Sequence, residues 1–383
     1  MPEGYANVNC VRRLAQTCLL TFLMMLLLGK PAIADVPYTL EPASSHSMTQ
    51  LIKMTGPLDF CGEPVPLDNP EVRERLEREF LLILWNRPQV ILWMKRSGRY
   101  MPYIEEVLKQ NNMPPDLKYI AVIESALTSH LSSSKGAKGS WQFIEGTGKK
   151  YGLKIDTDID ERRNFFSSTK AAVAYLKKLH DELGSWTLAA AAYNMGEEGL
   201  KAEMLLQNIK DYYYLYLPME TQQYVLRAVC VKEILSNPER YGFKVPKEDI
   251  YPPLMFDRVD VVCEHSTPVY IVAQAAKTYY KMIKDLNPEI RGHYLAKGEH
   301  PLLVPKGGGD GFQARYNDLL QKWLAMRNSH VYVVKKGESL SSIAASFDVP
   351  LPALLVWNNL SAKKQVKPGD RIYIFPAEEK GKK

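Results

Sequence analysis

The stretch Met113–Leu127, MPPDLKYIAVIESAL, decides the fold of the larger part of this chain. Its apolar residues recur at the spacing of one helical stripe that also includes an acid: Leu117, Ile120, Ala121, Glu124 and Leu127. Most glutamates lie on solvated helix faces. A carboxyl group on an apolar face loses hydration, which raises its pKa and lets it hold a proton near neutral pH. The stretch therefore predicts a helix and makes Glu124 a candidate general acid.

Helical periodicity extends on both sides of this stretch, from about residue 70 to about residue 240. The clearest segments are Glu71–Trp85, Arg99–Asn111, Thr169–Leu183, Trp186–Tyr193 and Glu220–Leu235. Alternating β-branched residues are nearly absent there, so we expect a mostly α-helical domain. We assign residues 70–112 to a helical N-terminal extension and residues 113–245 to the main domain.

Two similar segments follow the helical region. Val259–Val262 corresponds to Val331–Val334, and later matches keep the same order at nearly the same offset. Each copy has the pattern strand, helix, helix, strand. In the second copy these elements are a strand at 331–334, helices at 339–347 and 352–357, and a strand at 371–375. We therefore predict a multidomain chain in which two small α+β (βααβ) modules follow the helical domain.

The boundaries of these C-terminal parts follow from composition. The first module is placed at 257–306 and the second at 330–376. Residues 307–329 are predicted to be a linker, in which a run of glycines leads into a short helix before the second module. Residues 377–383 form a charged tail.

The N-terminus has the pattern of an export signal at residues 1–34. Arg12-Arg13 precedes an apolar run at 14–28, and Ala32-Ile33-Ala34 offers a cleavage site. The run is shorter than the ~20 residues of a spanning helix, which favours cleavage. An uncleaved anchor, and hence membrane association through this segment, is the alternative. Residues 35–69, rich in Pro, Ser and Thr, are predicted to be a linker, and the expected location is the periplasm or cell envelope.

Charge and cysteine content exclude several classes of protein. The net charge is +6, and it falls to +4 without residues 1–34. Such a mild surplus, without a long basic block, argues against nucleic acid and is compatible with an anionic polymer. The seven histidines are scattered, and the three cysteines beyond residue 34 have no close spacing. We therefore expect no metal site, no cofactor and no disulfide framework.

Four motifs stand in order along the helical region: Glu124-Ser125, GAKGSWQF at 136–143, AAYN at 191–194 and NPERYG at 237–242. Together they resemble the lytic murein transglycosylases with a goose-type lysozyme fold. The chain departs from that pattern at Ser129, where proline is usual, at Leu131, where a small residue is common, and at Ser140, where a bulky apolar residue usually precedes the tryptophan.

The two modules have a resemblance of their own. The second contains KGESL at 336–340 and KPGD at 367–370, and it resembles a LysM module. The first lacks both turns and resembles a degenerate LysM, so its ability to bind sugar stays open. The expected partner of the whole chain is the glycan strand of peptidoglycan, held by at least one such module.

The resemblance implies that Glu124 is the catalytic acid. It would protonate the oxygen of the bond between N-acetylmuramic acid and N-acetylglucosamine, and then accept a proton from the 6-hydroxyl of the same muramic acid. That hydroxyl closes onto the anomeric carbon and gives a 1,6-anhydro sugar without consuming water. An internal nucleophile has a high effective concentration, so one carboxyl group can serve both steps.

Four further residues are candidates for substrate binding on the same resemblance. Ser125 would orient the helix or form a hydrogen bond near the carboxyl group or the sugar. Gln142 offers a donor and an acceptor for sugar hydroxyls or amides. Tyr193 would hold the carboxyl group of Glu124 through its hydroxyl, and Asn194 would bind an acetamido group.

Two other functions stay open at this point. A lysozyme-like hydrolase on the same fold would use a second carboxylate, such as Asp156, Asp158 or Asp160, to activate water. A wall-binding protein without turnover would keep the fold and lose the chemistry. Product analysis separates the first alternative from a transglycosylase, and a Glu124→Gln variant tests the second.

Overall fold

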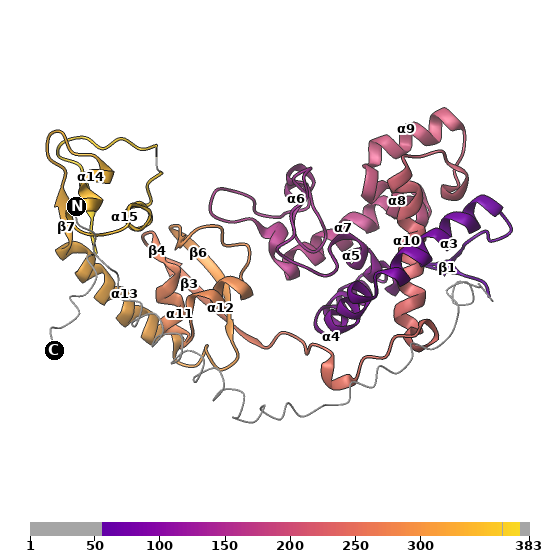
Figure 1. Ribbon diagram of the computed structural model, residues 1–383, viewed down its shortest axis with the longest axis horizontal. Helices are drawn as coiled ribbons and strands as arrows, with labels where there is room; N and C mark the ends of the chain where they lie inside the picture. Colours follow the sequence, from indigo (N-terminus) through magenta and orange to yellow (C-terminus); the bar gives the residue numbers. More distant parts are fainter. Residues whose placement is uncertain (1–55, 362, 376–383) are drawn as a thin grey trace, which may run out of the picture. The chain divides into compact units, whose positions relative to one another are not determined.

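The computed structural model describes residues 56–361 and 363–375 (Figure 1). The predicted export signal at 1–34, the part of the predicted linker at 35–55 and the charged tail at 377–383 lie outside these residues.

The helical domain contains every helix that the periodicity predicts. Its helices are α3 (Pro70–Trp85), α4 (Arg87–Gln110), α5 (Lys118–Ser125), α6 (Glu145–Lys150), α7 (Phe165–Leu183), α8 (Trp186–Met195), α9 (Glu197–Gln207) and α10 (Met219–Ser236). Helix α10 contacts α3, α5 and α8 and lies at the centre of this domain (Figure 1). Its residues are buried on most sides, as expected of a core helix.

The domain begins earlier than the sequence predicts. Within the predicted linker, β1 (Asp59–Phe60) and β2 (Glu63–Pro64) form a hairpin. The side chain of Phe60 is fully buried in the same core as α3 and α4. The prediction of a linker up to residue 69 is therefore wrong for this part, and residues 70–112 belong to the main domain. Two-residue strands carry no periodicity, which is why the pattern missed them.

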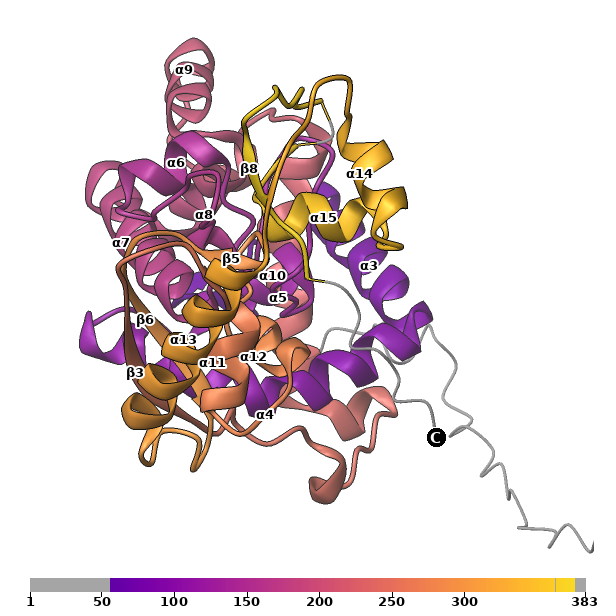
Figure 2. The same ribbon diagram turned by 90° about the vertical axis from the view of Figure 1, so that its left-hand side faces the viewer.

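The first module is built from two longer strands and two short helices. Its elements are β3 (Phe256–Cys263), β4 (Thr267–Pro268), α11 (Val269–Ala275), α12 (Tyr280–Leu286), β5 (Tyr294–Leu295) and β6 (Gly298–Pro305). Strands β3 and β6 pair antiparallel along their whole length (Figure 2). The predicted order of strand, helix, helix and strand is confirmed, with the short β4–β5 pair added between.

The second module repeats this order around its own core. Its elements are β7 (Val331–Val333), α14 (Leu340–Ser346), α15 (Leu351–Trp357) and β8 (Arg371–Tyr373), with β7 antiparallel to β8. In both modules an asparagine after the second helix forms hydrogen bonds with the backbone of the last strand. Asn287 exchanges hydrogen bonds with the backbone of Leu303 at 2.7 and 2.8 Å, and Asn358 does the same with Tyr373 at 2.6 and 2.8 Å. The repeat is thus structural as well as sequential.

The segment between the modules is not the linker that its glycines suggest. Helix α13 (Phe312–Ser329) packs Phe312, Tyr316 and Trp323 into the core of the first module. The glycine run wraps a carboxylate instead, since Asp257 accepts the backbone N–H groups of Gly307 and Gly309 at 2.7 and 3.2 Å. The prediction of a linker at 307–329 is therefore wrong.

In the described part of the chain, no single helix combines the length and the apolar character of a membrane span. Only α14 and α15 taken together reach that composition, and they are bent by 108° relative to each other.

Candidate active site

Glu124 lies at the end of α5, where the chain makes a tight turn. Ala126 and Leu127 follow it with φ of 53° and 58°, a left-handed conformation that costs energy for residues other than glycine. Arg96 of α4 stabilises the turn. Its Nη1 donates to the carbonyl oxygen of Ala126 at 2.9 Å and to Oγ1 of Thr128 at 3.0 Å. Helix α5 is thus held at its C-terminal end by α4.

The surroundings of Glu124 favour its protonated form. Burial raises the pKa of Glu124 to about 7, and the negative charge of Glu220 acts in the same direction. Two groups oppose this rise, the hydroxyl of Tyr224, which donates to Oε1 of Glu124, and the positive charge of Arg227. The carboxyl group therefore exchanges its proton close to neutral pH, as general acid and base catalysis require.

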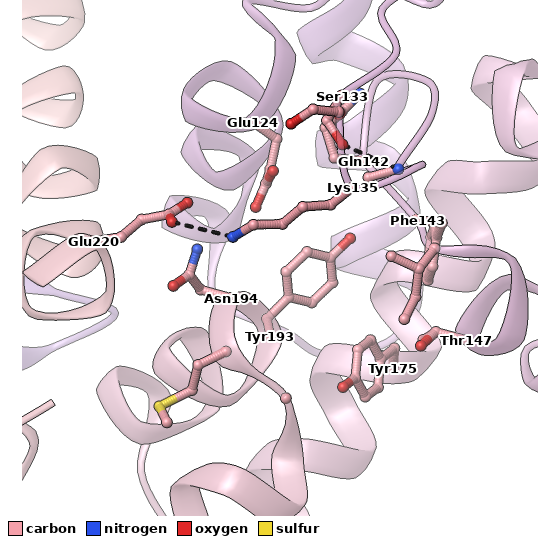
Figure 3. A pocket seen from close by; sticks show the side chains of 15 residues that line it. Glu124, Ser133, Lys135, Gln142, Phe143, Thr147, Tyr175, Tyr193, Asn194 and Glu220 are labelled. Atoms are coloured by element: carbon pink, nitrogen blue, oxygen red, sulfur yellow. Dashed lines mark hydrogen bonds and ion pairs between the residues drawn. The ribbon is translucent and has the colours of Figure 1, made fainter. Parts of the chain in front are cut away.

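Glu124 lies in an open cleft of about 450 Å³. Three residues predicted from the motifs line the same cleft: Gln142, Tyr193 and Asn194 (Figure 3). They come from the 139–143 loop and from α8, which are distant in sequence from α5. The fold thus gathers most of the predicted set around the carboxyl group, and their contact with sugar stays a prediction.

Two of these side chains are held by specific hydrogen bonds. Nε2 of Gln142 donates to the carbonyl oxygen of Gly139 at 2.7 Å. Gly139 cannot be replaced without a shift, because a Cβ there would lie 1.7 Å from the carbonyl oxygen of Arg162. Oδ1 of Asn194 accepts from Oγ1 of Thr221 at 2.7 Å. This leaves the amide nitrogen of Asn194 for a ligand, and in Figure 3 it faces into the cleft.

The tyrosine that holds the carboxyl group is not the predicted one. The hydroxyl of Tyr193 donates to the carbonyl oxygen of Trp141 at 2.8 Å, while Tyr224 of α10 donates to Glu124. The sequence offers little indication of this role, because Tyr224 occupies one of the regularly spaced apolar positions of a core helix. The one indication is that a buried tyrosine hydroxyl usually needs a hydrogen-bond partner.

Ser125 fulfils the orienting role rather than the substrate contact. Its side chain is 4% exposed and does not line the cleft. Its Oγ donates to the carbonyl oxygen of Ser140 at 2.8 Å and accepts the N–H of Thr128 at 3.2 Å. Ser129 and Ser140, two of the three departures from the family pattern, meet here with their hydroxyls 3.3 Å apart. These two departures therefore lie in contact with each other, next to the buried Ser125.

The aspartates of the hydrolase alternative are engaged elsewhere. Asp156 accepts the backbone N–H groups of Asp158 and Ile159 at 2.8 and 2.7 Å. Asp160 is buried in a bidentate pair with Arg162 at 2.8 Å. None of the three lines the cleft.

The carboxylates around the cleft are therefore few. Among the described residues that line the cleft, Glu124 and Glu220 are the two that carry a carboxyl group. Within residues 56–361 and 363–375 no cluster of three His, Cys, Asp or Glu side chains could hold a metal ion.

A cleft that presents hydroxyls, amides and one proton-exchanging carboxyl suits a glycosidic bond, so the site defines a glycan-cleaving enzyme. Comparison with known proteins narrows this class. Residues 101–215 match the Transglycosylase SLT domain family, and residues 332–375 match the LysM domain family. The chain is 33% identical over 331 residues to membrane-bound lytic murein transglycosylase D of Escherichia coli K12. The matched segment covers 82% of this chain and 72% of that relative. This chain belongs to the lytic murein transglycosylases.

Two further similarities are more limited. A putative tributyltin chloride resistance protein of Alteromonas is 34% identical over 124 residues, 32% of this chain and 59% of that protein. The 70 kDa soluble lytic transglycosylase of Escherichia coli is 16% identical, with 53% of this chain and 33% of that chain covered. The TM-score of this match is 0.33.

Proposed function

We propose that this protein cleaves the β-1,4 bond between N-acetylmuramic acid and N-acetylglucosamine in peptidoglycan and leaves 1,6-anhydro ends. The observation that carries the proposal is the state of Glu124, a carboxyl group whose pKa burial raises to about 7, in a cleft lined by Gln142, Tyr193 and Asn194. Such a group can donate a proton and take one back under the same conditions.

In the first step Glu124 donates its proton to the bridging oxygen as the bond to the anomeric carbon breaks. The positive charge that develops on the sugar ring stabilises the carboxylate that remains. The hydroxyl of Tyr224 also stabilises this carboxylate through its hydrogen bond to Oε1. The amide of Asn194 and the side chain of Gln142 would orient the acetamido and hydroxyl groups of the bound sugar.

In the second step the carboxylate of Glu124 accepts the proton of the 6-hydroxyl of the muramyl sugar. The oxygen of that hydroxyl forms a bond to the anomeric carbon and closes the anhydro ring. Glu124 ends protonated as it began, because the proton that it gives to the leaving oxygen is replaced by the proton of the 6-hydroxyl. The internal attack supplies up to ~7–11 kcal/mol of the barrier reduction through proximity.

The cleft favours this route over hydrolysis. An inverting hydrolase needs a carboxylate that activates water, and Asp156 and Asp160 are committed to other contacts. Glu220 is the second carboxylate of the cleft among the described residues, and it is exposed and paired with Lys135. The internal hydroxyl makes a second buried carboxylate unnecessary.

The decisive experiment is mass spectrometry of sacculi digested in heavy-oxygen water by the parent and by Glu124→Gln. We expect products that are lighter by one water than hydrolysis products and that carry no solvent oxygen. Glu124→Gln should release them at least about a hundredfold more slowly. Reducing ends that carry the heavy oxygen would refute the transglycosylase reaction and support a muramidase.

The proposal extends to the location of the enzyme and to the role of the second module. We place the enzyme in the cell envelope, exported through residues 1–34, where its substrate lies. The LysM module would hold the polymer and raise the local concentration of the catalytic cleft on an insoluble substrate. Fractionation of cells that express the full chain would test this placement, and a chain found in the cytoplasm would contradict it.

A further inference from the structure

A single cationic side chain reaches into the active-site cleft. Among the described residues that line it, Lys135 is the sole Lys, Arg or His. Figure 3 shows its side chain extended across the cleft between Glu124 and Tyr193, with the ammonium group directed to Glu220. Nζ of Lys135 lies 3.7 Å from Oε2 of Glu220. A positive charge therefore sits beside the position where the scissile bond must lie.

The backbone around Lys135 is well fixed. The N–H of Gly136 donates to the carbonyl oxygen of Ser133 at 3.1 Å, and the N–H of Ala137 donates to Oγ of Ser133 at 3.1 Å. From the other side, Nη1 of Arg162 donates to the carbonyl oxygen of Gly136 at 3.1 Å. This closed turn presents Lys135 to the cleft without requiring its charge for its own stability.

The ion pair that Lys135 makes is easily exchanged. The side chain of Lys135 is 83% exposed and that of Glu220 is 64% exposed. Exposed pairs at such a separation contribute little to stability, because water and salt screen them. A ligand carboxylate in the cleft would replace Glu220 at little cost, and it would gain a charge-assisted hydrogen bond partly shielded from solvent.

The substrate carries such a group. Every muramyl sugar bears a lactyl ether that ends in a carboxyl group, which is a free carboxylate where no peptide is attached. Where a peptide is attached, the carboxylates belong to the peptide. We propose that Lys135 binds a carboxylate carried by the muramyl residue beside Glu124, so that the cleft selects anionic glycan. This inference rests on the proposed function and names a specificity determinant of the same site.

The test is the steady-state kinetics of the full chain and of Lys135→Ala on three soluble glycan fragments. One fragment is peptide-free, one bears stem peptides, and one is peptide-free with its carboxyl groups converted to methylamides. Lys135→Arg tests whether charge alone suffices. Lys244→Ala is the matched control, since Lys244 is exposed and does not line the cleft.

We expect Lys135→Ala to raise KM about tenfold on a carboxylate-bearing fragment, with kcat nearly unchanged. It should leave KM on the methylamide unchanged, and Lys135→Arg should restore most of the affinity. An effect on the peptide-free fragment assigns the lactyl carboxylate, and an effect confined to the peptide-bearing fragment assigns the stem.

A KM that stays constant on both carboxylate-bearing fragments, or one that rises equally on the methylamide, would overturn the inference. The products of the same reactions, anhydro or reducing ends, report separately on the proposed function. Failure of one proposal is therefore distinguishable from failure of the other.

Discussion

At the scale of single residues, the proposed reaction depends on opposing influences on the pKa of one carboxyl group, that of Glu124. Burial alone would hold the proton on Glu124, and the hydroxyl of Tyr224 alone would release it. The combination brings the pKa to about 7. Such a group is a competent acid before bond cleavage and a competent base after it.

Replacing Glu124 with glutamine removes the proton that the reaction needs. We expect kcat of Glu124→Gln to fall by on the order of 10²–10⁴, while binding of glycan fragments persists because the shape of the side chain is kept. The measurement is turnover of soluble glycan together with affinity from calorimetry. Equal turnover of parent and variant would show that Glu124 is not the acid, and glycan binding without turnover by either would support a wall-binding protein.

The same substitution should change stability in a pH-dependent way. The pKa of Glu124 is raised in the folded state, so the unfolded chain loses the proton first, near pH 4.5, and the folded protein becomes less stable as pH rises toward about 7. Glu124→Gln has no proton to lose. Its melting temperature relative to the parent should therefore increase between pH 4.5 and pH 7 and be constant below that window. A constant difference across the window would contradict a raised pKa.

Tyr224→Phe tests the opposing force. Loss of the hydroxyl removes the hydrogen bond that lowers the pKa of Glu124, so the pKa rises further. The alkaline limb of the pH profile of kcat/KM should move to higher pH, and kcat should fall because the carboxylate loses its donor. Tyr241→Phe is the control, a buried tyrosine of the same domain that does not line the cleft. An alkaline limb that moves to lower pH would show that Tyr224 acts differently.

At the scale of elements, the hairpin at the start of the described chain supports the cleft from a distance. Oε2 of Glu63 in β2 accepts the N–H and the hydroxyl of Thr187 at 3.0 and 2.8 Å, and Oε1 accepts the N–H of Trp186. A carboxylate at a helix N-terminus satisfies free N–H groups and interacts favourably with the helix dipole. Helix α8, which carries Tyr193 and Asn194, is thus capped by a residue outside the matched SLT range.

Removal of this cap should weaken the domain. We expect Glu63→Ala to lower the free energy of unfolding by about 1–2 kcal/mol, since one substitution breaks several hydrogen bonds to the start of α8. Chemical denaturation of the full chain measures the change. Glu248→Ala is the control, because Glu248 is exposed and lies in neither α8 nor its cap. Equal stability of the two variants would mean that water replaces the cap without loss.

The elements that the sequence predicted are those with their own periodicity. Helix α5 and the two modules were predictable, because an apolar stripe and a repeated order of elements are local signals. The β1–β2 hairpin, the packing of helix α13 into the core of the first module and the hydrogen bond of Tyr224 to Glu124 were not. Each of these depends on a partner far along the chain, and one sequence does not reveal which distant side chains meet.

At the scale of the whole molecule, the chain joins a catalytic cleft to a module with a separate hydrophobic core. The LysM module packs its own buried residues around α14 and α15, apart from the core of the helical domain. Attachment of such a module to the polymer would keep the cleft near further bonds after each cleavage. Its effect should therefore appear on an insoluble polymer and vanish on short soluble fragments.

A chain that ends at Ser329 tests this division of work. It keeps the helical domain, the first module and α13, so kcat/KM on soluble glycan fragments should equal that of the full chain. On intact sacculi, the enzyme concentration needed for half-maximal cleavage should rise up to about a hundredfold, because the second attachment is lost. A similar loss on soluble fragments would place the module in the catalytic step. An unchanged rate on sacculi would mean that the first module, or the cleft alone, is sufficient to bind the enzyme to peptidoglycan.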